Sequence, residues 1–128
     1  MACMGLAGRL ILIVEDEPSV AVKIASAFEA AGARVNTTRT LREASHQIEN
    51  SGVSAAILDH LVGSVDISRL CQRLTALAIP FVIYATHEQI AAACSDGPLV
   101  PKPADPSLLV ATVEALLAGD HVPHVNAG

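Results

Sequence analysis

Three short runs of this sequence are fully apolar and stop abruptly at polar residues. Leu10-Ile-Leu-Ile-Val14 is followed by three acids, Ala55-Ala-Ile-Leu58 leads into Asp59, and Phe81-Val-Ile-Tyr-Ala85 is followed by Thr86. Runs of four or five apolar residues without alternation are typical of strands that are covered on both faces, as in a parallel sheet. Weaker strand patterns lie at 34–38 and around Leu99 and Val100.

Stretches with helical signals separate these strands. Pro18 suits the first turn of a helix that Gly32 can end, Thr40 and Glu43 have the spacing of a capping box, and Asp105 can cap a helix that opens with Pro106. We expect helices from Pro18 to about 31, at 40–50, at 65–78, at about 88–94 and at 106–117. Five alternating βα units predict an α/β fold with one open, doubly wound, five-stranded parallel sheet.

Length and composition favour one domain. The 128 residues fall within the usual range for a single domain, with expected tails at 1–8 and 119–128 around a domain at 9–118. Three aromatic residues and a net charge of −5 argue against a nucleic-acid partner, which would require clustered basic residues. The apolar runs are also too short to span a membrane.

The cysteines indicate neither a disulfide framework nor a zinc site. Cys3, Cys71 and Cys94 are odd in number, widely spaced and without a CxxC pair. We therefore expect Cys71 and Cys94 to be core residues in a reducing compartment, and the protein to be soluble and cytoplasmic.

We expect the functional residues at the carboxyl ends of the strands, because doubly wound sheets bind their ligands there. Glu15 and Asp16 follow the first strand, Asp59 the third and Lys102 the fifth, with Thr86 close to the end of the fourth. Clustered carboxylates need a neutralising cation, and an all-oxygen site with room for water suits Mg²⁺. We expect Asp59 to act as a nucleophile toward a phosphoryl group and Lys102 to neutralise a phosphoryl oxygen.

At this point the chain resembles the response-regulator receiver family of two-component systems, the CheY-like superfamily. The likeness rests on Ile-Val-Glu-Asp-Glu-Pro at 13–18, Ile-Leu-Asp at 57–59, the segment from Ile79 to Thr86, and Lys102-Pro103, and it covers about residues 9–118. The resemblance implies the flavodoxin-like strand order 2-1-3-4-5.

The resemblance also implies a metal site and a phosphorylation site. Glu15, Asp16, Asp59 and the carbonyl of Leu61 would hold Mg²⁺, with a cis peptide bond at Lys102-Pro103. Asp59 would accept the phosphoryl group from a histidine kinase or a histidine phosphotransfer protein. The chain would then be a signalling protein with weak self-catalysed phosphorylation rather than an enzyme, acting through an unknown effector protein.

Three positions depart from the family pattern. Ala85 stands where receivers usually have the switch Thr or Ser, with Thr86 one residue later. Leu99 occupies the aromatic signalling position, and Ala104 replaces a common bulky residue. These departures motivate an alternative of another class, a pseudo-receiver that binds proteins without being phosphorylated.

A third possibility, a small aspartate-based phosphohydrolase, lacks an acid two residues after Asp59, where Leu61 stands. The histidines share no metal-ligand spacing, although His60 and His87 flank the expected site. No Walker-type, GxGxxG or GxSxG motif is present, which disfavours P-loop enzymes, dinucleotide-binding oxidoreductases and hydrolases of that type.

Overall fold

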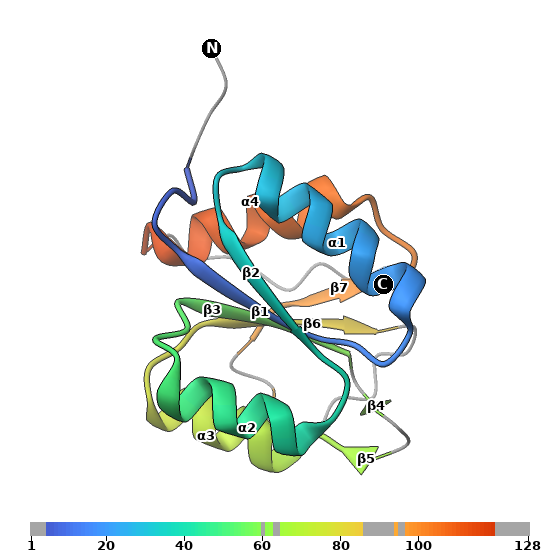
Figure 1. The fold of residues 1–128 in the computed structure, drawn as a ribbon, viewed down its shortest axis with the longest axis vertical. Coiled ribbons are helices and arrows are strands. Elements are labelled where there is room, and N and C mark those ends of the chain that lie inside the picture. Colours follow the sequence, from blue (N-terminus) through green and yellow to red (C-terminus); the bar gives the residue numbers. More distant parts are fainter. Residues whose placement is uncertain (1–4, 60, 63–64, 86–93, 95–96, 120–128) are drawn as a thin grey trace.

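The structure is a three-layer α/β sandwich. The computed structural model describes residues 5–59, 61–62, 65–85, 94 and 97–119. Its central sheet has five parallel strands in the order β2-β1-β3-β6-β7. Helices α1 and α4 cover one face of the sheet, and α2 and α3 cover the other (Figure 1). This is the predicted doubly wound fold with strand order 2-1-3-4-5.

The strands occupy the apolar runs. Their bounds are β1 Leu10–Val14, β2 Arg34–Thr38, β3 Ala55–Asp59, β6 Phe81–Ala85 and β7 Leu99–Pro101. All five residues of β1 and of β6 are buried, whereas the edge strand β2 is largely accessible. The continuous apolar pattern is therefore found where both sheet faces are covered, as expected.

Two of the described helices, α2 and α4, begin directly after their predicted capping residues, Thr40 and Asp105. The described helices are α1 Pro18–Ala30, α2 Leu41–Asn50, α3 Ser68–Ala76 and α4 Pro106–Leu117. The Thr40 side chain accepts a hydrogen bond from the Glu43 amide, and the Asp105 side chain accepts one from the Ser107 amide. Each cap satisfies a free backbone N–H in the first turn of its helix.

Two apolar clusters pack on the two faces of the sheet. Alternate strand residues such as Leu12 and Leu58 pack toward α2 and α3, while Ile13 and Ile57 pack on the opposite face in the cluster that contains Phe28 of α1. Because strand side chains alternate between faces, this division also fixes the face on which each residue at the strand ends begins.

The segment after Asp59 differs from its prediction. We expected one helix at 65–78, but Val65–Asp66 is a strand, β5, which pairs antiparallel with β4, Leu61–Val62. The helix begins only at Ser68 and ends before Ala78, whose φ of 58° lies in the left-handed region. Ile67, Leu70, Cys71 and Leu74 have helical spacing, but Val65 lies two residues before Ile67 and does not share their face of a helix, so the apolar pattern supported the helix only from Ile67 onward.

Two apolar side chains also differ from expectation. Leu6, which we placed in the N-terminal tail, is fully buried, and its amide donates a hydrogen bond to the Ala31 carbonyl. Val22 of α1 is an apolar residue in a largely apolar helix, where a buried side chain would be expected, but it is 63% exposed. The ordered domain therefore includes Leu6. The predicted helix at about 88–94 lies outside the described residues, except for Cys94.

The cysteine prediction was wrong for two of the three residues. Cys71 of α3 and Cys94 are both fully buried, as expected of core residues, but they form a disulfide bond. They are 23 residues apart in sequence, with a Cα–Cα distance of 5.0 Å. Spacing along the chain could not reveal this pair, because the two residues meet only in the folded protein, in the apolar cluster on the α2 and α3 side of the sheet. The cysteines therefore no longer support a reducing compartment.

Candidate functional site

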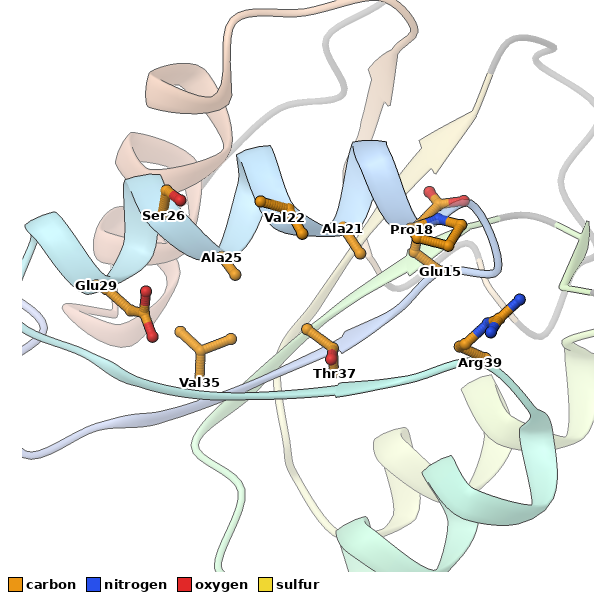
Figure 2. Close-up of a pocket in the computed structure, with 10 residues that line it drawn as sticks. All are labelled: Glu15, Pro18, Ala21, Val22, Ala25, Ser26, Glu29, Val35, Thr37 and Arg39. Atoms are coloured by element: carbon orange, nitrogen blue, oxygen red, sulfur yellow. The ribbon is translucent and has the colours of Figure 1, made fainter.

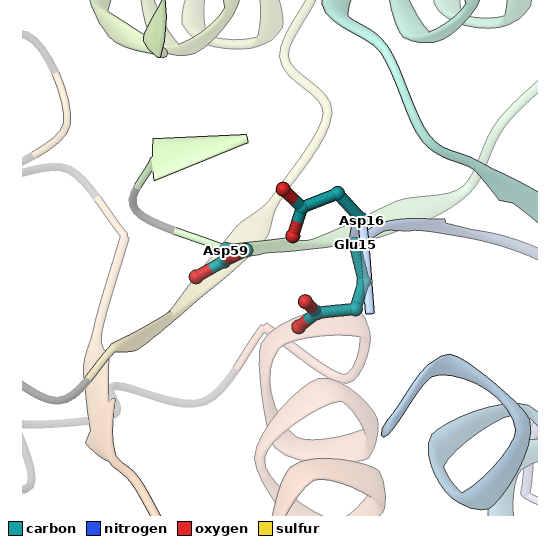
Figure 3. A group of neighbouring side chains, drawn as sticks. All are labelled: Glu15, Asp16 and Asp59. Carbon is teal, nitrogen blue, oxygen red and sulfur yellow. The ribbon is translucent and has the colours of Figure 1, made fainter. Parts of the chain in front are cut away.

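Three carboxylates meet at the carboxyl end of the sheet. Glu15 and Asp16 follow β1 directly, and Asp59 is the last residue of β3, the strand that pairs with β1. One carboxylate oxygen from each residue can be chosen such that all three lie within 4.8 Å of one another. Figure 3 shows the three side chains extending from these two strand ends into the same space.

Glu15 is a buried acid in this group. It is 3% exposed, its backbone amide donates to the Thr38 carbonyl, and its side chain accepts a hydrogen bond from the Glu17 amide. Burial, and next the negative charge of Asp59, raise the pKa of the Glu15 carboxyl above its usual 4.5, although Lys102 acts in the opposite direction. The fold thus holds an acid where its ionised form needs a cation nearby.

Lys102 supplies one positive charge to the group. Its Nζ donates to Asp59 at 3.1 Å and to Glu15 at 3.5 Å. Burial, the largest effect, lowers the pKa of Lys102, but the hydrogen bonds and charges of Asp59 and Glu15 outweigh it and raise that pKa above 10.5. The ammonium therefore stays charged at neutral pH and links β7 to both acidic strand ends.

The donor set fits a hard divalent cation. Three carboxylates and one ammonium have a formal net charge of −2, which one divalent cation would balance. All the candidate ligand atoms are oxygens, and the Asp59 side chain is 14% exposed, so that water can complete the coordination. Glu15, Asp16 and Asp59 are therefore compatible with Mg²⁺ binding.

The remaining predicted residues have mixed outcomes. Leu61 is in β4, two residues beyond Asp59, and its carbonyl as a metal ligand stays a prediction. The Lys102-Pro103 peptide bond is cis, as predicted. Thr86, His60 and His87 lie outside the described residues.

The positions that depart from the receiver pattern are apolar in the structure. Ala85 and Leu99 are buried in the cluster that faces α2 and α3, and Ala104 packs against the cluster on the other face. Ala85 brings no hydroxyl to the end of β6, but its carbonyl accepts a hydrogen bond from the Lys102 amide at 2.8 Å.

Tyr84 is the residue that we missed in the sequence. Its ring centroid is 5.2 Å from the Lys102 Nζ, and its hydroxyl hydrogen-bonds to the backbone of Ala104. A tyrosine within a buried aliphatic strand needs a partner for its hydroxyl, and this was the available signal in the sequence.

A groove of about 390 Å³ lies between α1 and β2, beside the carboxylates (Figure 2). Its walls are mostly apolar, with Ala21, Val22 and Ala25 on α1 facing Val35 on β2. Glu15 lines one end of it, but neither Asp59 nor Lys102 does. Because the carboxylates and Lys102 converge at the strand ends, we take the strand ends, and not the groove, as the candidate functional site.

Among curated proteins, the chain is similar to the transcriptional regulatory protein TcrA of Mycobacterium tuberculosis. The two are 33% identical over 73 residues, which are 57% of this chain and 29% of TcrA. The chain thus spans less than a third of the curated relative that it matches. No family model matches the sequence.

Solved structures show the same fold. A protein from Chloroflexus aurantiacus described as a response regulator is 28% identical, with a TM-score of 0.75 over 86% of this chain and 98% of that one. A CheY-like response regulator receiver domain protein from Methanospirillum hungatei is 20% identical, with a TM-score of 0.76 over 87% and 94% of the two chains.

The described helices include none that is long and apolar enough to cross a membrane.

Proposed function

We propose that this chain, whose fold is that of response-regulator receiver domains, accepts a phosphoryl group on Asp59 and thereby acts as a switch in two-component signalling. The observation that carries the proposal is the contact between Lys102 and Asp59 within a cluster of three carboxylates. The fold alone supports a signalling role of this general kind, and the residues at the strand ends support the specific chemistry.

Asp59 is suited to act as the nucleophile. A carboxylate oxygen of Asp59 would attack the phosphorus of a phosphohistidine, an O–P bond would form, and the N–P bond would break with its electron pair going to the imidazole. Lys102 is already within hydrogen-bond distance of Asp59 and can donate to a phosphoryl oxygen once the group is transferred.

Glu15, Asp16 and Asp59 would hold Mg²⁺, with the Leu61 carbonyl as a further ligand. When bound, the ion would neutralise charge on the transferring phosphoryl oxygens. The chain's own contribution is to keep its acids together: the Thr38 carbonyl fixes the Glu15 backbone, and Lys102 offsets part of the repulsion between Glu15 and Asp59.

The test is the intact mass of the protein after incubation with acetyl phosphate and MgCl₂. We expect a gain of one phosphoryl group that requires magnesium and is absent in Asp59→Asn. Asp105→Asn is the matched control, because it makes the same substitution at an exposed helix cap that asparagine also serves well. This control should gain the phosphoryl group as the wild type does.

A folded wild-type protein that gains no phosphoryl group would favour the pseudo-receiver. Ala85 favours that second candidate specifically, since a buried methyl group stands where the family has a hydroxyl. Steady release of inorganic phosphate from small phosphoesters would instead favour the phosphohydrolase.

The further parts of the proposal follow from the chemistry of Asp59. The phosphoryl donor would be a histidine kinase or a histidine phosphotransfer protein. An effector protein would bind according to the phosphorylation state of Asp59. Self-catalysed phosphorylation and dephosphorylation would be weak, and the chain would be a signalling phosphoacceptor rather than an enzyme. We propose a cytoplasmic location on the basis of this donor alone.

A further inference from the structure

The short segment that follows β7 is hydrogen-bonded to β6 at two points. We call residues 102–104 the strap. At its start, the Lys102 amide donates to the Ala85 carbonyl at 2.8 Å. At its end, the Ala104 amide donates to the Tyr84 hydroxyl at 3.0 Å, and that hydroxyl donates to the Ala104 carbonyl at 3.3 Å. Both polar groups of Ala104 are therefore engaged by one side chain of β6.

Tyr84 also lies beside the functional end of Lys102. The Lys102 Nζ is 5.2 Å from the centroid of the Tyr84 ring, within the range of a cation–π contact. Tyr84 is the register partner of Asp59 on the neighbouring parallel strand. In-register residues of parallel strands start on the same face of the sheet, so Asp59 and Tyr84 approach Lys102 from adjacent strands.

The hydroxyl and the ring thus constrain Lys102 in different ways. The hydroxyl fixes the backbone two residues beyond Lys102, and the ring limits the directions in which the ammonium can point. Tyr84 is 7% exposed, so water competes little for its hydroxyl. Neither feature requires Tyr84 to contact the Asp59 oxygens.

We propose that Tyr84 is a positioning residue, which holds the strap against β6 and directs the Lys102 ammonium toward Asp59. The effect of Tyr84 on phosphoryl transfer rests on the proposed function, since Lys102 matters to that transfer only if Asp59 accepts the phosphoryl group. The placement of Lys102 itself can be tested without any phosphoryl donor.

Two variants separate the hydroxyl from the ring. Tyr84→Phe removes the hydrogen bonds to Ala104 and keeps the ring, whereas Tyr84→Leu removes both. Val82→Ala is the matched control, because Val82 is a fully buried residue of β6 on the same face, two residues before Tyr84. This control should lower stability without loosening the strap.

The first measurement is NMR of the lysine side chains and of the Ala104 amide, in the absence of any phosphoryl donor. The chain has two lysines, Lys102 and the exposed Lys23, so Lys23 is an internal reference. We expect Ala104 hydrogen exchange to accelerate about fivefold or more in Tyr84→Phe, because the variant loses the hydrogen bond that the Ala104 amide donates. Lys102 signals should shift in Tyr84→Phe and further in Tyr84→Leu, with Lys23 unchanged.

The second measurement is the rate of phosphoryl uptake as a function of acetyl phosphate concentration. We expect the maximal rate to fall about fivefold in Tyr84→Phe and further in Tyr84→Leu, with little change in the half-saturating concentration. Val82→Ala should keep the wild-type rate.

The two measurements distinguish failure of this inference from failure of the proposed function. Lys102 signals that shift as expected, in a protein that takes up no phosphoryl group, would support the positioning role and reject the phosphoacceptor function. Lys102 signals and Ala104 exchange that are the same in Tyr84→Leu as in Val82→Ala would overturn the positioning role.

Discussion

At the scale of single residues, the site is a set of charges that compensate one another. Glu15 is 3% exposed, and Lys102 is the cation that contacts both it and Asp59. The sequence placed these residues at strand ends, but it could not show that Glu15 is buried while the neighbouring Asp16 is partly accessible. Burial differs because consecutive residues after β1 leave the sheet in different directions.

The raised pKa of Glu15 predicts a pH dependence of stability in metal-free protein. Its folded-state pKa lies above 4.5, so the resulting stabilisation is complete below pH 4.5 and is lost as the pH rises through the folded-state value. Lys102 does not alter this window, because its contribution is complete at any pH below 10.5. In Glu15→Gln, the free energy of unfolding should therefore fall less than in the wild type as the pH rises from 4.5 to neutrality.

Urea denaturation in EDTA at several pH values checks this prediction. Glu29→Gln, at an exposed position of α1, should follow the wild-type profile. Parallel profiles for the wild type and Glu15→Gln would contradict the prediction.

At the scale of elements, α3 and its surroundings depart most from what the sequence predicted. The helix starts at Ser68 after the β4–β5 pair, and Cys71 in its first turns is bonded to Cys94. Local sequence patterns predict each helix or strand separately. The β4–β5 pairing and the disulfide bond each join two segments of the chain, so such patterns do not predict them. A pairing of two cysteines 23 residues apart depends on where the fold places them.

The disulfide predicts a redox-dependent stability. A cross-link that closes a loop of this length should contribute about 3 kcal/mol to the free energy of unfolding, and reduction should remove that contribution. Urea denaturation with and without dithiothreitol measures the difference. Alkylation of the denatured protein should add one label without reductant, on Cys3, and three labels after reduction.

Cys71→Ser is the control for the reductant itself. Dithiothreitol should not change the stability of this variant, because it cannot form the bond. Three labels on unreduced wild-type protein would show that the bond does not form in solution.

At the scale of the whole molecule, the acidic site joins strands that are distant in sequence. Glu15 and Asp59 follow adjacent strands of the sheet, and Lys102 reaches both from the end of β7. A cation bound there would hold β1 and β3 together and would be released when the chain unfolds. Binding to the folded state alone stabilises the whole fold.

Magnesium should therefore raise the free energy of unfolding of the wild type. At ten times its dissociation constant, the increase should be about 1.4 kcal/mol. Asp59→Asn should show a smaller increase. Sodium chloride at equal ionic strength controls for screening in a chain with a net charge of −5, and an equal gain with either salt would contradict the prediction.

Local patterns in the sequence were enough to predict the layers of this protein and the residues at its strand ends. Continuous apolar runs at 10–14 and 81–85 and the caps at Thr40 and Asp105 are local signals, and the structure confirms each of them. Because parallel strands end at one edge of a sheet, the convergence of Glu15, Asp59 and Lys102 also followed from the pattern.

Which of these groups are in contact, and which residues support them, could be seen only in the folded protein. The contact of Lys102 with both acids, the role of the Tyr84 hydroxyl at Ala104 and the Cys71–Cys94 bond all join segments that no local pattern relates. The physical reason is that secondary structure reflects spacing along the chain, whereas burial and hydrogen-bond pairing depend on how the helices pack against the sheet.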